Sequence, residues 1–339
     1  MRATVLTAPG RIEITEVEPP RLQKPDDAIV RLAATCVCGS DLWNYRGLRA
    51  VGEPQRPGHE LVGVVTEIGP EVTAVRVGDF VVGPFNSSCG ECVHCRAGFQ
   101  TACVAVQMFR PGTQAEAVRI PLANGTLVAL AEPPEPALIP SLLACSDVIS
   151  TGWHAAVMAG VREGSAVAVV GDGAVGLCGV IAAKMLGAER IIVSSRHAQR
   201  QELAAEFGAT DILAERGDAF AAAVKDLTDG VGADAALECV GTREALLQAC
   251  ASARAGAIVG FVGVPVGVEI PLEPFFRRNI GLRGGMAPVR NYLPQMIDLV
   301  LSGAIDPGKV FDVTMPLDEV AEAYAAMDER RAIKVLLEP

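Results

Sequence analysis

The segment 166–186 (AVAVVGDGAVGLCGVIAAKML) limits what this chain can fold into more than any other stretch. It begins with a wholly apolar, β-branched run that is typical of a buried parallel strand. Three glycines follow, spaced as G-x-G-x-x-G, and then an apolar run that favours a helix. A second strand-like run at 190–194 completes the pattern. Because the motif stands between a strand and a helix, it indicates a dinucleotide-binding turn.

Each glycine of this turn has a separate physical task. Gly171 permits the tight turn, Gly173 lets the backbone approach a pyrophosphate, and Gly176 lets the helix pack closely on the strand. Ala174 and Val175 open the helix, whose free N–H groups would hold the phosphates. An ordinary structural turn is the alternative, and the flanking strand and helix weigh against it.

The bulk properties of the chain narrow its class. With 339 residues, of which 50% are hydrophobic, two domains are expected. The formal net charge of -11 argues against nucleic acid and anionic membranes as partners, because both attract basic surfaces. No apolar stretch approaches the roughly 20 residues of a membrane helix, and the N-terminus lacks a signal-like apolar run. We therefore expect a cytoplasmic, metabolic protein whose ten cysteines are reduced.

Strand and helix signals divide the chain into a β-rich part, an alternating part and a mixed tail. The alternating part predicts a doubly wound parallel sheet, because apolar strands and amphipathic helices follow one another. Its six expected strands are 166–170, 190–194, 211–213, 233–238, 256–262 and 279–283. Elsewhere we expect strands at 3–6, 12–17, 28–34, 60–68, 75–82, 116–120, 127–130 and 333–337, and helices at 141–144, 292–302 and 317–327.

The sharpest chemical signal is C-x2-C-x2-C-x7-C, formed by Cys89, Cys92, Cys95 and Cys103. Four thiolates at this spacing can close a tetrahedral zinc shell, since each short loop turns back on the same ion. Disulfides fit poorly with a chain that has no secretion signal. An iron–sulfur cluster is disfavoured because no proline follows the last cysteine and no second cluster occurs. His94 lies inside the loop but is surplus to four ligands, so we expect it in solvent.

Two more potential ligands, Cys38 and His59, are 21 residues apart. Taken alone, each residue is better interpreted as an ordinary core residue. A buried cysteine packs as a small hydrophobe, and a lone histidine is more often a core residue than a metal ligand. Their sequence context decides whether they belong to a site.

Five motifs follow one another along the chain. They are Cys38-Gly39-Ser40-Asp41, Gly58-His59-Glu60, the four-cysteine loop, Ser150-Thr151-Gly152 and the turn from Gly171 to Gly176. In this order they resemble the motifs of the zinc-containing medium-chain alcohol dehydrogenases, over essentially the whole chain. The resemblance implies an α/β protein with a GroES-like, β-rich catalytic domain (1–149 and 287–339) and a Rossmann dinucleotide-binding domain (150–286). It also implies an active site between them.

In that family the catalytic zinc takes ligands from the first two motifs and from a position four residues before the threonine of S-T-G. Carried over, the ligands are Cys38, His59 and Asp147, and one open position remains, as in other catalytic zinc sites. Cys145 competes with Asp147, because many relatives have a cysteine ligand there. It lies six residues before Thr151 rather than four, so Asp147 is favoured.

Two carboxylates next to these ligands have roles in the family. Glu60 would lie close to the metal or bind it transiently, and Asp41 would accept the second ring N–H of His59 and fix its tautomer. Ordinary surface charge is the alternative for both. With the four-cysteine loop, two zinc ions per chain are expected.

The resemblance implies hydride transfer between a nicotinamide cofactor and an alcohol or carbonyl, with zinc polarising the substrate oxygen. Ser40 would pass the alcohol proton to a relay. Thr151 would pack against the nicotinamide, with Val262 and Val264 on its other side. Trp43 stands where many relatives have the histidine that completes the relay, so it would either wall the substrate pocket or pack in the core.

The end of the second Rossmann strand selects the cofactor. An NAD-binding domain has Asp or Glu there, about 20 residues past the glycines, but here no carboxylate precedes Glu202. The segment holds Ser194, Ser195, Arg196 and Arg200, and hydroxyl and guanidinium groups suit the 2′-phosphate of NADP(H). The Ser-Arg pair also resembles that of NADP-dependent secondary alcohol dehydrogenases. The alternative is that Arg196 and Arg200 are solvated charges at the start of a helix and bind no phosphate.

The leading prediction is therefore a zinc-dependent, NADP-preferring alcohol dehydrogenase or carbonyl reductase, assembled as a homodimer or homotetramer as its family members are. A polyol or sugar dehydrogenase is the near alternative. A zinc-free enone reductase would lack the ligands found here, and a catalytically idle structural or binding homologue would not need them. A count of bound zinc distinguishes these possibilities.

Overall fold

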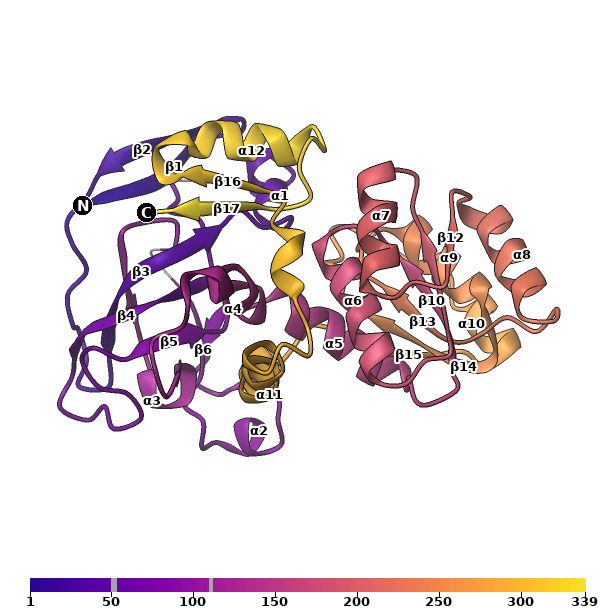
Figure 1. Ribbon diagram of the computed structural model, residues 1–339, viewed down its shortest axis with the longest axis horizontal. Coiled ribbons are helices and arrows are strands. Elements are labelled where there is room, and N and C mark those ends of the chain that lie inside the picture. The colour runs from indigo at the N-terminus through magenta and orange to yellow at the C-terminus, as the bar shows by residue number, and fades with distance from the viewer. Residues whose placement is uncertain (50–53, 110–111) are drawn as a thin grey trace. The chain divides into compact units, whose positions relative to one another are not determined.

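The computed structural model describes residues 1–49, 54–109 and 112–339. The chain forms two compact units. Met1–Asp147 together with Pro288–Pro339 make the terminal unit, and Val148–Ala287 make the central unit. The terminal unit is thus built from both ends of the chain, and both termini lie in it (Figure 1).

The central unit is built on a six-stranded parallel sheet with the order β12-β11-β10-β13-β14-β15. Helices lie on both sides of it (Figure 1), which confirms the doubly wound fold expected from the sequence. The order reverses between β10 and β13, so the loops after β10 and β11 lie at the edge where open α/β sheets bind ligands. The strands are β10 (Ala166–Val170), β11 (Arg190–Ser194), β12 (Asp211–Leu213), β13 (Ala233–Glu238), β14 (Ala253–Phe261) and β15 (Gly281–Gly284).

The helices of the central unit bury their apolar faces against this sheet. On one side Phe220 and Val224 pack with Leu246 and Ala249, all of them nearly or fully inaccessible to water. This burial drives the layers together, because apolar area removed from water stabilises the fold. The helices are α5 (Val148–Ala159), α6 (Ala174–Met185), α7 (Ala198–Phe207), α8 (Gly217–Leu227), α9 (Arg243–Ser252) and α10 (Glu273–Arg278).

The terminal unit is β-rich, as expected for a GroES-like domain. Strand β3 pairs antiparallel with β4, β8 and the last strand of the chain, β17. Leu336 is paired with Cys36, so the C-terminal segment completes a sheet that the N-terminal segment begins. The strands are β1 (Arg2–Ala8), β2 (Arg11–Glu16), β3 (Ala28–Cys36), β4 (Leu61–Ile68), β5 (Phe80–Gly83), β6 (Asn86–Ser87), β7 (Gln107–Met108), β8 (Ala117–Ile120), β9 (Val128–Ala129), β16 (Val313–Pro316) and β17 (Val335–Glu338).

Two apolar clusters fill the terminal unit. One gathers side chains of β3, β4 and β8, among them Val30, Leu61 and Ile120. The other surrounds Tyr324, a fully buried residue of the C-terminal helix α12. The helices are α1 (Asp41–Tyr45), α2 (Val93–Arg96), α3 (Ala123–Thr126), α4 (Ile139–Cys145), α11 (Val289–Leu301) and α12 (Val320–Asp328), with 3-10 turns η1 (Gln100–Ala102), η2 (Pro136–Leu138), η3 (Pro307–Val310) and η4 (Leu317–Glu319).

The strand expected at 75–82 is largely wrong. The carboxylate of Asp79 accepts the backbone N–H of Arg76 at 2.8 Å, and Gly78 has a φ of +97°. These features form a turn, and the strand is confined to Phe80–Gly83. Glu60 likewise lies outside β4, which begins at Leu61.

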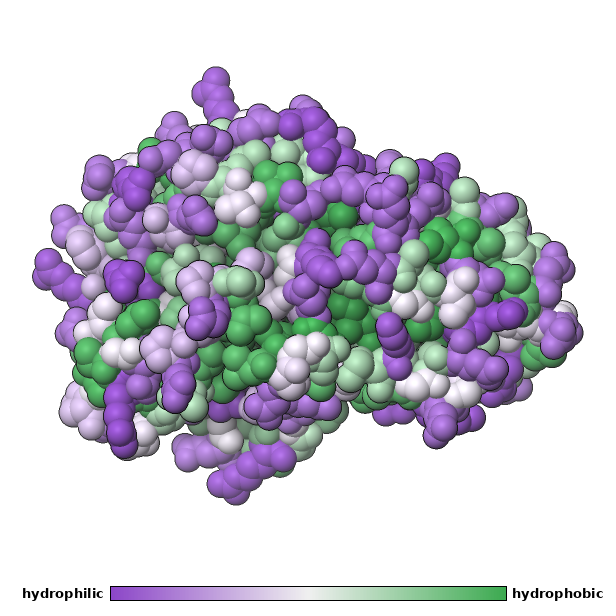
Figure 2. Space-filling model, viewed as in Figure 1, coloured by the Kyte–Doolittle hydropathy of each residue, from purple (hydrophilic) through white to green (hydrophobic). Residues whose placement is uncertain are grey.

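Hydrophilic side chains are prominent over the face shown in Figure 2, with apolar residues between them. In the described part of the chain no single helix is both long and apolar enough to cross a bilayer; only the bent pair Pro136–Cys145 and Val148–Ala159 reaches that length, and only together.

Candidate functional site

Four potential metal ligands meet in the terminal unit: Cys38, His59, Glu60 and Asp147. The sheet brings three of them together. Cys38 follows the end of β3, and His59 and Glu60 precede the start of β4, which is the antiparallel neighbour of β3. Asp147 comes from the segment after α4. One ligand atom from each residue lies within 4.8 Å of all the others.

The separations suit a zinc ion. Asp147 Oδ2 lies 3.7 Å from Cys38 Sγ and 3.4 Å from His59 Nε2. Zinc–ligand bonds of about 2.0–2.3 Å in a tetrahedron place mixed ligand atoms about 3.3–3.5 Å apart. Glu60 Oε1 lies slightly farther out, 3.9 Å from His59 Nε2. The donor set of one sulfur, one imidazole nitrogen and carboxylate oxygens therefore fits zinc.

A buried lysine that no sequence motif indicated is paired with Glu60. Lys334 Nζ lies 2.6 Å from Glu60 Oε1, and both side chains are 1% exposed. The same ammonium donates to the backbone carbonyl of Val37 at 3.2 Å. Burial raises the pKa of Glu60, while the charge of Lys334 opposes that rise. A lysine within the apolar run 332–337 was the available signal, because a lysine is almost never buried without a partner.

A buried polar network supports the histidine. Asp41 Oδ1 lies 3.6 Å from His59 Nδ1, a close contact that is longer than a normal hydrogen bond. Asp41 Oδ2 accepts from the backbone N–H of Cys38 at 2.9 Å and from Gln114 Nε2 at 3.3 Å. The Tyr324 hydroxyl donates to Gln114 Oε1 at 3.1 Å. Gln114 and Tyr324 thus orient Asp41 toward the site, and no sequence motif singled them out.

The charges around His59 favour its protonated form when no metal is bound. Burial by itself lowers the pKa of His59, but the neighbouring Cys38, Asp41 and Asp147 outweigh it and raise that pKa well above its usual value. A bound cation would replace this proton, since zinc binds neutral imidazole.

Other predicted residues of this region lie as follows. Cys145 is fully buried, its thiol donates to the Ser141 carbonyl at 3.3 Å, and it is not part of the four-residue group. Ser40 immediately precedes α1, and Trp43 lies half-buried on that helix. Thr151 lies on α5 in the central unit and is buried.

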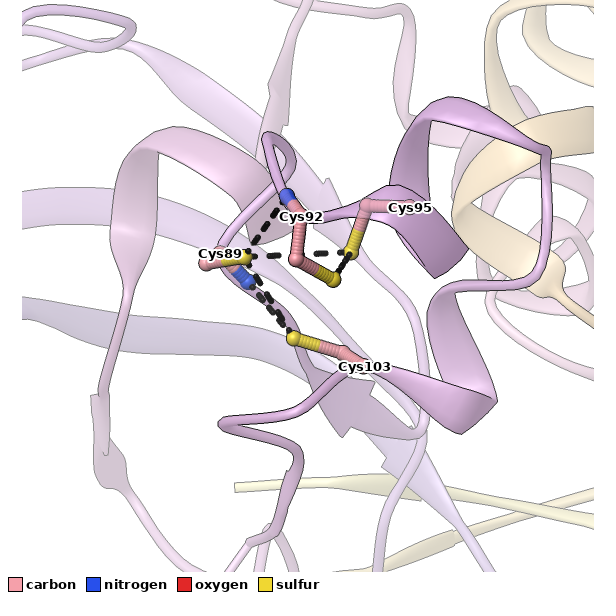
Figure 3. Close-up of side chains that lie close together, drawn as sticks. All are labelled: Cys89, Cys92, Cys95 and Cys103. Atoms are coloured by element: carbon pink, nitrogen blue, oxygen red, sulfur yellow. Dashed lines mark hydrogen bonds between the residues drawn. The ribbon is translucent and has the colours of Figure 1, made fainter.

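The second group is the four-cysteine loop (Figure 3). The sulfur of Cys89 lies 3.9 Å from that of Cys95 and 3.5 Å from that of Cys103, and Cys92 lies 3.5 Å from Cys95. These distances rule out disulfides, whose sulfurs are about 2.05 Å apart, and they suit four Zn–S bonds of about 2.3 Å. His94 is exposed on α2.

Backbone N–H groups point at these sulfurs. Cys89 N–H donates to Cys103 Sγ at 3.3 Å, and Cys92 N–H donates to Cys89 Sγ at 3.4 Å. Backbone N–H groups, those of Cys95 and Val104 first, lower the pKa of the Cys92 thiol to about 6. Such donors stabilise thiolates, which are the form that binds zinc.

The glycine turn in the central unit has the geometry that a dinucleotide needs. Gly171 has a φ of +116°, which disfavours any side chain. A Cβ on Gly176 would lie 1.9 Å from the Gly171 carbonyl oxygen, whereas a Cβ on Gly173 would meet nothing within 4 Å. The backbone at Gly173 therefore faces open space, and no side chain caps the α6 N-terminus that Ala174 and Val175 begin. Free N–H groups in open space fit a pyrophosphate.

The residues predicted to hold a 2′-phosphate are in part engaged within the protein. The hydroxyl of Ser195 is buried and donates to Asp172 Oδ2 at 2.8 Å. Arg200 Nη1 lies 3.5 Å from Asp172 Oδ1. The hydroxyl of Ser194 accepts from Gln248 Nε2 at 3.1 Å and, like Ser195, is buried.

Arg196 is exposed at the same edge. Of the two valines expected beside the nicotinamide, Val262 is buried and Val264 is 37% exposed.

Comparisons with known proteins agree with this architecture. Residues 24–133 match the alcohol dehydrogenase GroES-like domain family, and residues 174–302 match the zinc-binding dehydrogenase family. A probable zinc-binding alcohol dehydrogenase of Mycobacterium tuberculosis is 36% identical over 97% of this chain and 86% of its own length.

Solved structures with the same fold include an alcohol dehydrogenase from Thermus sp. ATN1, with 33% identity and a TM-score of 0.91 over 100% of this chain and 99% of that one. A second solved structure, that of a zinc-binding dehydrogenase from Sinorhizobium meliloti 1021, is bound to NADP. It has 28% identity and a TM-score of 0.85 over 100% of this chain and 99% of that one.

A GroES-like unit, a Rossmann unit and two groups of potential metal ligands define a zinc-containing medium-chain dehydrogenase. The chain belongs to the zinc-type alcohol dehydrogenase family and is an oxidoreductase of that family.

Proposed function

We propose that the protein is a zinc-dependent oxidoreductase that transfers hydride between NADP(H) and an alcohol/carbonyl pair, either a secondary alcohol and ketone or a primary alcohol and aldehyde. The observation that carries this proposal is the convergence of Cys38, His59, Glu60 and Asp147, each of which places one ligand atom within 4.8 Å of the others. Sulfur, imidazole and carboxylate ligands with one position left for substrate are typical of a catalytic zinc.

In this proposal Cys38, His59 and Asp147 hold the catalytic zinc, and the four cysteines of the loop hold a structural one. A bound zinc supplies a Lewis acid that polarises the substrate oxygen. Glu60 stays beside the site, restrained by Lys334. Two zinc ions per chain follow from the two groups.

The chain's own residues handle the proton and orient the reactants. Ser40 takes the alcohol proton, and Asp41 orients the His59 ring. Thr151 and the segment with Val262 and Val264 position the nicotinamide. Trp43, a half-buried residue of α1 three positions after Ser40, lines the substrate pocket.

NADP(H) is proposed over NAD(H) because the end of β11 offers arginines and no carboxylate of its own. Arg196 is exposed there and can pair with a 2′-phosphate. The NADP in the Sinorhizobium meliloti structure belongs to that protein and supports the proposal only as a precedent. We keep as predictions from the sequence the domain assignment of 1–149 with 287–339 and of 150–286, a cytoplasmic location and a homodimer or homotetramer.

Metal analysis and kinetics test the function. We expect about two zinc ions per purified chain. Cys38→Ala, His59→Ala and Asp147→Ala should each remove one zinc and most activity while the fold persists, since the four-cysteine loop is separate. Cys145→Ala is the matched control and should keep both ions, because Cys145 does not belong to the group formed by Cys38, His59, Glu60 and Asp147.

A panel of primary, secondary, cyclic and polyhydric alcohols with their carbonyls, assayed with both cofactors, identifies the substrate class. A protein with zinc only in the four-cysteine loop would point to the idle or zinc-free alternative. Loss of zinc in Cys145→Ala but not in Asp147→Ala would overturn the ligand assignment.

A further inference from the structure

Asp172 carries the only charged side chain of the G-x-G-x-x-G turn, Gly171 to Gly176. It is the residue between Gly171 and Gly173, two positions after the end of β10. Because β10 and β11 are parallel neighbours, with Val170 opposite Ser194, the loops after both strands leave the same edge of the sheet. Asp172 therefore lies beside the residues predicted to read the ribose of the cofactor.

The contacts of Asp172 are those that an anion makes. Its carboxylate accepts the Ser195 hydroxyl at 2.8 Å and lies 3.5 Å from the guanidinium of Arg200. The Asp172 carbonyl accepts from the same guanidinium at 3.4 Å. Serine hydroxyl and arginine are also the groups that bind a 2′-phosphate. The Asp172 carboxylate thus contacts Ser195 and Arg200, two of the donors that are expected to bind the 2′-phosphate.

We propose that Asp172 is a specificity-determining residue that weakens the binding of 2′-phosphorylated adenine nucleotides. Its carboxylate holds the Ser195 hydroxyl and the Arg200 guanidinium in contacts within the protein. It also repels a 2′-phosphate that binds at the same edge of the sheet. Selection of NADP(H) then depends on the net effect of one carboxylate against the two arginines, Arg196 and Arg200. The inference rests on the proposed binding of the adenosine ribose of NADP(H) at this edge.

Binding of two nucleotide fragments to the intact, zinc-loaded protein tests this role without any turnover. Calorimetric titration with 2′,5′-ADP and with 5′-AMP compares the wild type with Asp172→Asn, which keeps the shape and removes the charge. We expect Asp172→Asn to bind 2′,5′-ADP about tenfold more tightly, because unit charges a few ångströms apart near a protein surface interact by more than RT. The affinity for 5′-AMP should rise less than that for 2′,5′-ADP, because 5′-AMP lacks the 2′-phosphate that would lie beside Asp172.

The matched control is Asp226→Asn. Asp226 is exposed near the end of α8, and the carbonyl of the next residue, Leu227, accepts from Arg190 at the start of β11. This places Asp226 at the opposite edge of the sheet, so the control removes the same charge and should leave both affinities unchanged. Asp172→Ala gives a second variant in case the asparagine disturbs the turn.

The outcomes separate the two proposals. Unchanged or weaker 2′,5′-ADP binding in both Asp172 variants, relative to Asp226→Asn, would overturn the role of Asp172 and leave the cofactor proposal intact. Equal binding of the two fragments by the wild type would overturn the preference for NADP(H). In that case a tenfold gain in Asp172→Asn would still support the role of Asp172.

Discussion

At the scale of single residues, a buried ion pair involves one of the four potential metal ligands. Lys334 and Glu60 form an ion pair with 1% exposure on each side. Taking both ions out of water is costly, and their attraction offsets that cost only while both partners are present. The ion pair therefore fixes the position of Glu60 but adds little to the net stability of the fold.

Removal of the lysine charge should expose this dependence. We expect Lys334→Met to lower the free energy of unfolding by about 3–5 kcal/mol, because it strands a buried carboxylate. The double variant Lys334→Met with Glu60→Gln should recover much of the loss, since no unpaired charge remains. Urea unfolding of the zinc-loaded proteins measures both values; equal destabilisation of single and double variants would contradict the explanation.

Cofactor selection is also a property of single side chains. We expect Arg196→Met to lower kcat/KM with NADP(H) at least about tenfold and to leave kcat/KM with NAD(H) nearly unchanged, because the guanidinium would meet only the 2′-phosphate. Ser195→Asp with Arg196→Ile should shift preference toward NAD, but it is a poorer test. Ser195 Oγ is buried 2.8 Å from the Asp172 carboxylate, so an aspartate there would place two carboxylates together.

Steady-state kinetics with both cofactors measures the Arg196→Met effect. Equal losses with the two cofactors would show that Arg196 acts on folding or on a part that both cofactors share. A wild type that is equally or more efficient with NAD would refute the preference itself.

At the scale of elements, the four-cysteine loop has little hydrophobic core of its own. The loop from Cys89 to Cys103 contains only the short helix α2 and the 3-10 turn η1. Little apolar area is buried there, since Val93 and Val104 are 72% and 75% exposed. If the four cysteines hold zinc as proposed, metal binding is coupled to local folding.

Cys103→Ser should reveal that coupling. We expect loss of one zinc and a lower melting temperature, while zinc at the Cys38 group is retained, because the two groups share no residue. Metal analysis and calorimetry of the same preparation measure the two effects. Unchanged zinc content together with unchanged melting would refute a structural role for the loop.

Helix α5, in contrast to the largely exposed four-cysteine loop, is buried along most of its length. A helix that is apolar all round belongs in a core, and α5 carries His154 there. Burial lowers the pKa of His154 to about 4. The neutral ring is therefore favoured in the folded protein.

The sign of the resulting pH dependence follows from linkage. Above a pH of about 6.5 His154 is neutral in both states. As the pH falls from there toward 4, the unfolded chain takes up a proton that the folded chain refuses, so stability is lost. We expect wild type to lose about 2–3 kcal/mol more than His154→Gln between pH 7.5 and 4.5. Parallel urea-unfolding profiles of the two proteins over that range would contradict this expectation.

At the scale of the whole molecule, the two units differ in how they depend on the ends of the chain. The central unit, Val148–Ala287, is one continuous segment with its own sheet and core. The terminal unit needs both ends, because β17 pairs with β3 and Lys334 neutralises Glu60.

This difference predicts the behaviour of fragments. We expect residues 148–287 to fold alone with a cooperative urea transition, whereas residues 1–147 should not, since they lack β17, α12 and Lys334. Circular dichroism during urea titration of each fragment measures this. A non-cooperative central fragment, or a cooperative 1–147 fragment, would contradict it.

What the sequence alone determined is what local spacing encodes. The glycines at 171 and 176 predict their turn, because the left-handed φ of Gly171 and the close backbone approach at Gly176 admit no side chain. The spacing of Cys89, Cys92, Cys95 and Cys103 predicts that their sulfurs meet, because short loops leave few other arrangements. Alternating strands and helices predict the doubly wound sheet, since a parallel strand requires a crossover.

Only the tertiary structure decided which distant groups meet. Lys334 reaches Glu60 because the last strand of the chain pairs with β3, and Tyr324 reaches Gln114 because α12 is buried against the same unit. Asp172 faces Ser195 because β10 and β11 are adjacent in the sheet. Burial makes each of these polar contacts strong, and burial belongs to the packed fold rather than to any short stretch of sequence.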